Sequence, residues 1–391
     1  MFKKSAYGMA VLFIALAIAS CGGNGKKEVK NVKDTVKKTV QKDTLKVNKA
    51  YTDIAKFISG MNVDEKSELY KLSQSESFKS YAKSSDSSWK KLEKKRLLKM
   101  KTWAEAELSD LNKDITTLFY PFSGPDFLHA QTFFPNTKKI IMFGLEPVGD
   151  IPDIKKIPGE KLGKFFNAMN YSIGDVLSLS FFKTIDMGKE LNSDMINGSL
   201  PIMLLFIVRT GHEIVDIKPT EINKDGKMVY IDSFKNLKGE ASYNRGAEIV
   251  YVDEGDTVLR RICYFSANVA DGALKMNPNC AKFFENIENN VVTMIKSASY
   301  LMHNTYFSIV RNAVLNKSKA FFQDDSGIAF RYIDGSRWNV RLYGVYNGPI
   351  PMFKNRFEED LQEAYKNGKA KPINFQYGYG SHCGLLVARK R

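Results

Sequence analysis

The residue types best suited to chemistry gather in the segment FYPFSGPDFLHAQTFFPN, which starts at Phe119. Ser123, Asp126 and His129 stand there at intervals of three and carry the hydroxyl, carboxylate and imidazole that a hydrolase uses. The segment lacks the G-x-S-x-G turn that presents a nucleophilic serine. Its spacing also fits a capped helix, in which Ser123 and Asp126 bind free N–H groups and Pro125 lies in the first turn. We expect the capped helix and keep the hydrolase as the alternative.

A second polar cluster, QDDSG, starts at Gln323 between two apolar segments. The adjacent carboxylates of Asp324 and Asp325 could bind a hard cation or act as acid and base. A tight hairpin also uses Asp, Ser and Gly in this order, and the spacing does not fit an EF-hand loop. We expect a hairpin turn, and the two aspartates remain the second set of catalytic candidates.

Metal and cofactor motifs are missing from the sequence. The chain has four histidines and four cysteines, and their spacings match no zinc-ligand pattern. Gly378 and Gly380 are not followed by a helix, so they do not form a phosphate-binding loop. We therefore expect no metal and no cofactor. Cys263 and Cys280 are close enough in sequence for a disulfide in an oxidising compartment. The sequence is compatible with this bridge and with two free thiols.

The first residues of the chain predict export. Lys3 and Lys4 precede the apolar run MAVLFIALAIA, which is shorter than the about 20 residues that span a bilayer and has the length of a signal-peptide core. The sequence IASC that follows resembles the lipobox of bacterial lipoproteins. The resemblance implies cleavage after residue 20 and lipid on Cys21, whereas the alternative is an ordinary signal peptide. We expect a lipid-anchored protein of the cell envelope, at the outer membrane.

Residues 21–49 predict a flexible linker, because residues 22–49 hold nine lysines, three acids and no aromatic side chain. The whole chain has a formal charge of +15, which favours anionic partners. In an exported protein these are anionic lipid surfaces or acidic glycans, and we expect no nucleic-acid partner. A lysine-rich surface that simply faces water is the other interpretation.

Two regions follow the linker. Residues 50–117 predict a helical segment, interrupted by serines at 84–88, whose helix from Trp89 to Leu111 has an apolar side and a lysine side. That basic side could lie on a membrane or face water while the apolar side packs on the protein. Residues 118–391 predict a globular body with strands at Lys139–Leu145, 213–217, 228–234, 247–252, 257–265, 320–323, 328–333 and 338–346, and helices at 163–182, 281–315 and 357–366. Residues 201–208 fit either a strand or a helix.

Several of these strands come in pairs separated by short turns, and helices are interspersed without regular alternation. This pattern predicts an α+β fold with a mixed, largely antiparallel sheet, hairpins and flanking helices, preceded by a helical N-terminal segment.

The segments FYPFSGPDFLHAQTFFPN, QDDSGIAFRY and LYGVYNGPIPMF together resemble an uncharacterised family of exported bacterial proteins, many of them lipoproteins. The resemblance covers residues 118–379 and implies one folded unit, without assigning a role to any residue. Two functions are compatible with the sequence. The favoured one is an envelope lipoprotein that binds a protein or glycan partner; the alternative is a hydrolase that uses Asp126 and His129 with Ser123 or with Asp324 and Asp325.

Overall fold

The strands of the protein form one mixed sheet. In the computed structural model, residues 46–179, 197–234, 243–378 and 384–391 are described, so the signal peptide, Cys21, residues 22–45 of the predicted linker and Gly380 lie outside the described residues. The strands are β1 (Thr117–Tyr120), β2 (Lys139–Gly144), β3 (His212–Ile222), β4 (Met228–Tyr230), β5 (Arg245–Asp253), β6 (Arg260–Ser266), β7 (Val291–Ile295), β8 (Ser318–Asp324), β9 (Trp338–Gly344) and β10 (Gly384–Lys390).

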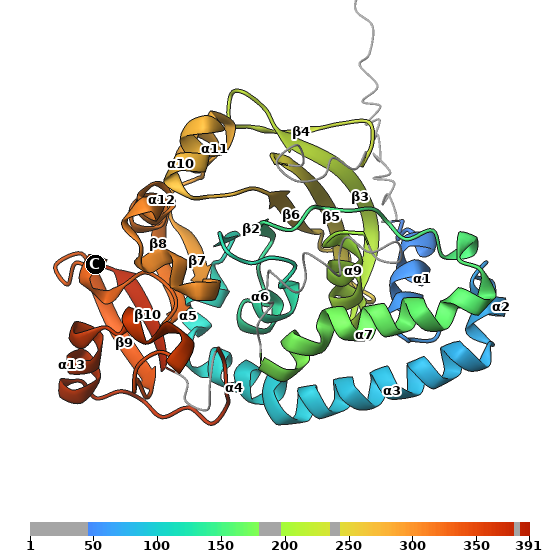
Figure 1. Cartoon of the computed structure of the whole chain (residues 1–391), viewed down its shortest axis with the longest axis horizontal. Helices are drawn as coiled ribbons and strands as arrows, with labels where there is room; N and C mark the ends of the chain where they lie inside the picture. Colours follow the sequence, from blue (N-terminus) through green and yellow to red (C-terminus); the bar gives the residue numbers. More distant parts are fainter. Residues whose placement is uncertain (1–45, 180–196, 235–242, 379–383) are drawn as a thin grey trace, which may run out of the picture. The chain divides into compact units, whose positions relative to one another are not determined.

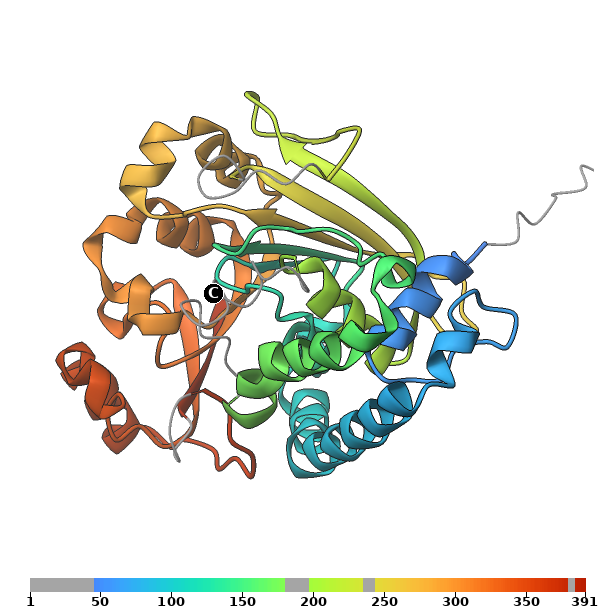
Figure 2. The same ribbon diagram turned by 45° about the vertical axis from the view of Figure 1, so that its right-hand side comes forward.

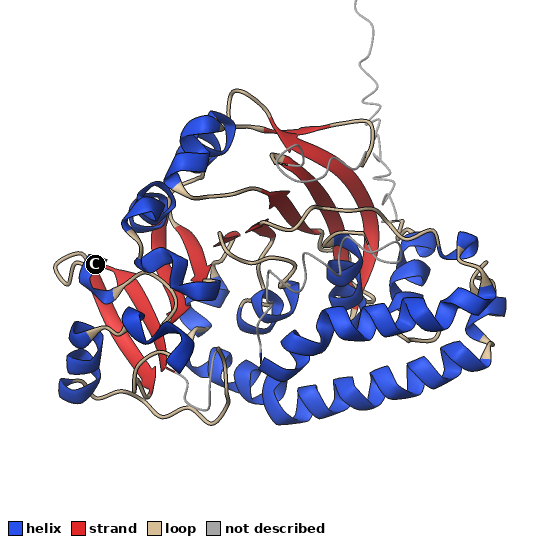
Figure 3. Cartoon of the chain, in the orientation of Figure 1, coloured by secondary structure: helices blue, strands red, loops and turns tan. Residues whose placement is uncertain are grey.

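The strand order is β4-β3-β5-β6-β2-β1-β7-β8-β10-β9 (Figures 1 and 3). The five central strands, β6-β2-β1-β7-β8, are mutually parallel. Antiparallel strands continue the sheet on both sides, with β5, β3 and β4 beyond β6, and β10 and β9 beyond β8. The parallel strands are apolar on both faces, as a strand covered by helices on both sides must be.

Helices cover one face of the sheet and enclose the larger hydrophobic core (Figures 1 and 2). α3 and α7 lie side by side in both views. α9 is apolar all round and buried from Leu200 to Val208, which settles the ambiguous segment as a helix. The helices of this face are α1 (Lys49–Ile58), α2 (Tyr70–Ser73), α3 (Glu76–Leu92), α4 (Leu98–Glu107), α5 (Ser109–Lys113), α6 (Phe127–Phe133), α7 (Leu162–Leu179) and α9 (Leu200–Arg209), with a π-helical turn at Glu93–Leu97.

A second core lies on the opposite face, where side chains that alternate with those of the first core point away from it. Phe119, Ile141, Cys263 and Phe321 belong to this core. Its helices are α10 (Asp271–Met276), α11 (Pro278–Asn286), α12 (Ser308–Lys317) and α13 (Glu359–Asn367), with 3₁₀ turns that include η5 (Ala298–His303), η7 (Phe330–Tyr332) and η8 (Pro351–Arg356).

The α+β class, the mixed sheet and the helical N-terminal segment are confirmed, as are the hairpins β3–β4 and β5–β6. Three details were wrong. The serines at 84–88 do not interrupt a helix, because α3 runs through them. The predicted strand 328–333 does not form, because Phe330–Tyr332 make η7, so Asp324 and Asp325 do not close a hairpin. The predicted helix 281–315 contains the central strand β7.

The helical segment packs directly on the sheet. In α4, Trp103 is 9% exposed, and its ring lies 5.0 Å from that of Tyr343 in β9 and 5.7 Å from that of Phe322 in β8. Arg389 in β10 donates to Asp110 of α5 at 2.7 Å. The segment and the body therefore share one core and belong to one unit.

Candidate ligand-binding site

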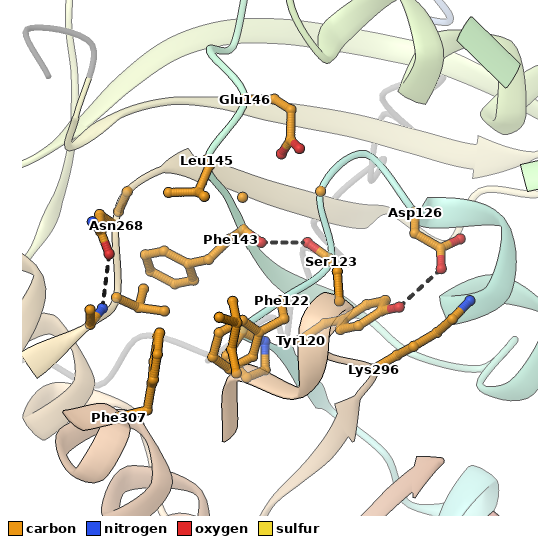
Figure 4. Close-up of a pocket in the computed structure, with 18 residues that line it drawn as sticks. Tyr120, Phe122, Ser123, Asp126, Phe143, Leu145, Glu146, Asn268, Lys296 and Phe307 are labelled. Carbon is orange, nitrogen blue, oxygen red and sulfur yellow. Dashed lines mark hydrogen bonds between the residues drawn. The ribbon is translucent and has the colours of Figure 1, made fainter. Parts of the chain in front are cut away.

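A cavity of about 290 Å³ opens at the carboxyl ends of the central parallel strands (Figure 4). β1, β2, β6 and β7 each end at its wall. Its lining is mainly apolar, with a few polar side chains, as is usual for small-molecule sites. The lining residues are 120–124, 126, 143–146, 267–270, 296, 298, 301 and 307.

The strand order explains this position. β1 lies between β2 and β7. The chain leaves β1 toward β2 through α6, on the face of the larger core, and leaves β7 toward β8 through α12, on the opposite face. The loops after β1 and β7 therefore leave the sheet in opposite directions and open a crevice between them. In open, doubly wound sheets, ligands bind at this switch point, outside the carboxyl ends of the strands.

Glu146 is the acidic side chain that follows β2 on the cavity wall, and it is only 5% exposed. A Cβ at Gly144 would stand 2.6 Å from Glu146 Oε2, and one at Gly124 would stand 3.4 Å from it. The glycine at 144 therefore makes room for the carboxylate, whereas a side chain at 124 would only touch it. Tyr264 donates its hydroxyl to the Glu146 carbonyl at 2.7 Å, which fixes the backbone. The sequence interpretation missed Glu146 because the parallel arrangement of β1 and β2 was not foreseen.

The loop after β1 is tied to the end of β2. The backbone N–H groups of Ser123 and Gly124 donate to the Phe143 carbonyl at 2.9 and 3.2 Å, and the Ser123 hydroxyl donates to the same oxygen at 3.1 Å. The predicted cap at Ser123 was therefore wrong. Asp126 is the N-cap of α6, and its Oδ1 accepts from the His129 N–H at 3.2 Å.

Asp126 and His129 form a buried pair behind the cavity. His129 Nδ1 lies 2.8 Å from Asp126 Oδ1, and the Tyr120 hydroxyl donates to Asp126 Oδ2 at 2.9 Å. Burial opposes the charge of Asp126, but the neighbouring His129 and Lys296 outweigh it and hold the pKa of Asp126 below its ordinary value. Burial, with Lys296 nearby, lowers the pKa of His129, although Asp126 opposes that shift.

Lys296 connects this pair to Asp324. It follows β7, lines the cavity and carries its ammonium 4.5 Å from the ring centre of Tyr377. Asp324 ends β8, and burial raises its pKa while Lys296 and Ser326 oppose that rise. Within the described residues, Asp324 Oδ2 has no hydrogen-bond partner. Three of the sequence candidates, Asp126, His129 and Asp324, thus meet around a lysine that the sequence did not single out.

Asp325 contacts Tyr300 and His303 instead of the residues around Lys296. Its Oδ2 accepts from the Tyr300 hydroxyl at 2.7 Å, and its carbonyl lies 3.0 Å from His303 Nε2. Burial and the adjacent Asp324 raise the pKa of Asp325 to about 7. Glu358 lies 3.5 Å from His303 Nε2, so this is a second acidic cluster. The structure therefore separates the two aspartates that the sequence treated as a pair.

Hydrolysis needs a nucleophile in contact with its base. Ser123 lies at the cavity, but its hydroxyl is directed at the Phe143 carbonyl, while the nitrogen Nδ1 of His129 is occupied by Asp126. The arrangement places a hydroxyl and a carboxylate on one cavity wall without a nucleophile–base contact. It suits binding better than acyl transfer.

Cys263 and Cys280 are buried free thiols, so the possible disulfide between them does not form. Within the described ranges, no group of three or more His, Cys, Asp or Glu side chains is placed to hold a metal ion. In the same residues, no helix combines the length and apolar character that a bilayer span requires.

Comparison of the chain with protein-family models, with curated proteins and with solved structures gave no match. The resemblance to exported bacterial proteins therefore stays a prediction, and the function is argued from the cavity.

Proposed function

We propose that this protein binds a small molecule of the nucleoside class in the cavity at the carboxyl edge of the sheet. The observation that carries the proposal is Glu146, a buried carboxylate at the end of β2 that faces the cavity at the switch point. In doubly wound folds, an acidic side chain at this place accepts hydrogen bonds from ribose hydroxyls, so the assignment is an analogy at the level of the fold.

The apolar wall of the cavity suits a flat ring. Phe122 and Phe307 stand 5.8 Å apart between ring centres, and Leu145 completes an apolar surface beside them. Asn268 uses its side-chain oxygen on the Ala270 N–H at 3.0 Å, which leaves its amide NH₂ as a donor at the cavity. Figure 4 shows Asn268, Leu145 and Phe307 on the side of the cavity opposite Asp126 and Lys296. A ring with polar edges fits the side that Asn268, Leu145 and Phe307 form.

The loop after β1 disfavours a phosphate group. It contains a single glycine, Gly124, where phosphate-binding turns carry several. The N-terminus of α6, which would otherwise attract an anion, is capped by the carboxylate of Asp126. Asp126, Glu146 and Lys296 line the cavity, so its acidic side chains outnumber its basic one, which favours a neutral or cationic ligand over an anion.

The experiment is isothermal titration of the chain with adenosine, with S-adenosylmethionine as a cationic nucleoside, and with ATP and NAD as phosphate-bearing compounds. We expect one of the first two to bind and the phosphate compounds to bind more weakly. Glu146→Gln should weaken binding by roughly tenfold or more, because a hydrogen bond to a charged group is lost. Glu65→Gln, at an exposed position away from the cavity, is the matched control and should bind like the parent chain.

Absence of binding by every compound in the panel would contradict the proposal. Equal binding by the Glu146→Gln chain would also contradict it, because the ligand would then not contact the carboxylate.

The expected location in the cell envelope remains part of the proposal. The predicted signal peptide, the cysteine at residue 21 and the cavity open at one edge of the sheet support a lipid-anchored protein of the outer membrane that captures a small solute. A protein or glycan partner bound elsewhere on the body remains a separate prediction, and so does the hydrolase that uses the residues around Asp126.

A further inference from the structure

A continuous helical rod carries a dense row of lysines on its outer side. α3, the π-helical turn and α4 follow one another without a break from Glu76 to Glu107. The inner side of this rod is buried, through Phe78, Tyr81, Leu92 and Met100 among others. The outer side is not covered by any described element, and it lies along one edge of the molecule (Figures 1 and 2).

The lysine face consists of Lys79, Lys83, Lys90, Lys91, Lys94, Lys95, Lys99 and Lys101, all of them exposed. Two of these are neutralised locally, because Lys79 pairs with Glu76 at 3.2 Å and Lys90 with Asp86 at 2.8 Å. Across the part of the chain that the structure describes, the other six have no ion pair with an acidic side chain. The stretch from Lys90 to Lys101 carries one acid, the half-buried Glu93.

An exposed apolar side chain stands among these charges. Leu98 is 51% exposed, between Lys94 and Lys101 on the helix surface. Five of the unpaired lysines, those from Lys91 to Lys101, lie within seven residues of this leucine, so the helix surface here is cationic with one apolar side chain in it. Lysines on such a helix surface are attracted to anionic headgroups, and the exposed leucine can enter the headgroup region.

We propose that this lysine face docks on a bilayer surface rich in anionic phospholipid. Charge complementarity supports it, since juxtamembrane lysines are attracted to anionic headgroups over about one Debye length. The lysine-rich stretch 22–49, most of which precedes the described residues, supports it independently, because it holds nine lysines and three acids and follows the expected lipid-bearing cysteine. The docking surface is separate from the cavity, so it stands whether or not the cavity binds a nucleoside.

A bilayer fits this face better than a protein groove does. The lysines are spread along the rod over several turns, and the only exposed large apolar side chain among them is Leu98, so the face offers no buried anchor for a protein partner. A membrane surface needs no shape complementarity and responds mainly to charge density.

The test is cosedimentation with vesicles of about one-third phosphatidylglycerol in phosphatidylcholine, with vesicles of phosphatidylcholine alone as reference. The protein used begins at residue 22, so that neither the apolar segment of residues 9–19 nor a lipid anchor contributes. The face variant combines Lys91→Glu, Lys94→Glu, Lys95→Glu and Lys99→Glu. The matched control makes the same charge change at four exposed lysines elsewhere, at Lys138, Lys227, Lys275 and Lys369.

We expect the parent chain to bind the anionic vesicles at low salt, to release them at about 0.5 M salt and to ignore the neutral ones. The face variant should lose roughly tenfold or more of its vesicle affinity, and the control variant much less. Circular dichroism melting curves confirm that both variants fold.

Three results overturn the proposal. They are absence of binding by the parent chain, equal losses in the two variants, which would assign binding to net charge alone, and full binding by the face variant, which would assign it to the N-terminal lysines. Tighter binding of a DNA duplex than of the vesicles would overturn the lipid as the partner.

Discussion

At the scale of single residues, burial decides what the acidic groups can do. Asp126 keeps its charge because His129 and Lys296 surround it, whereas Glu358 has much weaker compensation. Glu358 is 4% exposed, and burial raises its pKa to about 8, despite the Phe330 N–H that donates to it and the nearby Arg331. Asp325 and Asp360 add to the rise, and His303, whose pKa burial lowers to about 4, contributes no charge at neutral pH.

This pKa predicts how stability depends on pH. In the unfolded chain Glu358 ionises near its ordinary pKa of 4.5, so between that value and about 8 the folded chain holds a proton that the unfolded chain has released. The contribution of Glu358 to stability is therefore complete below 4.5 and is lost as the pH rises toward 8. Glu358→Gln should remove this loss. The urea midpoint of the variant should therefore rise relative to that of the parent chain as the pH increases from 4.5 to about 8.

Glu359→Gln, at the exposed neighbouring position, serves as the control and should follow the parent curve. Parallel pH curves for the parent and Glu358→Gln chains would show that Glu358 is ionised in the folded protein at neutral pH.

At the scale of elements, two hairpin turns need glycine for different reasons: one for its backbone conformation alone, the other also because a helix packs against it. Gly226 in the β3–β4 turn has φ of +67° and lies against α11, where a Cβ would stand 2.6 Å from the backbone of Lys282. Gly255 in the β5–β6 turn has φ of +80° with open space around it. Both turns need the left-handed backbone that glycine adopts without cost, and only the first also needs the missing side chain.

We expect Gly255→Ala to lower the free energy of unfolding by about 1 kcal/mol, the usual penalty of a side chain at positive φ. Gly226→Ala should lower it by roughly 1–3 kcal/mol more, because α11 must move away from the turn. Urea denaturation of both variants measures the difference. Equal losses would mean that α11 accommodates the methyl group freely and that the turn alone sets the cost.

At the scale of the whole molecule, the proposals give different roles to three features: the cavity at the sheet edge, the lysine face and the N-terminal cysteine that is expected to bear lipid. Under these proposals, the cavity would decide which solute the protein holds, and the expected anchor would decide where it holds that solute. The lysine face would orient the body once the anchor has brought it to a bilayer.

The anchor has its own test. We expect the parent chain, expressed in a Gram-negative host, to fractionate with the outer membrane and to incorporate labelled palmitate, whereas Cys21→Ser should do neither, because a lipidated cysteine is the attachment. Cys280→Ser is a control at a buried thiol that cannot carry the lipid. Palmitate incorporation that persists in Cys21→Ser would contradict the lipobox assignment.

The sequence by itself determined the features that depend on neighbours along the chain. The apolar run before Cys21, the helical periodicity of residues 50–112 and the hairpins β3–β4 and β5–β6 follow from short-range patterns, and the described elements among them were found where expected. Asp126 and His129 could be singled out because three residues on a helix bring side chains together.

Only the tertiary structure decided the site. β1 lies beside β7, more than 170 residues later in the chain, and five buried parallel strands share the same apolar character, so no local pattern states which strands pair. Glu146 and Lys296 each look like an ordinary charged residue after an apolar run. They become parts of one cavity because parallel strands end at one edge of the sheet, and that edge exists only after every strand has found its place.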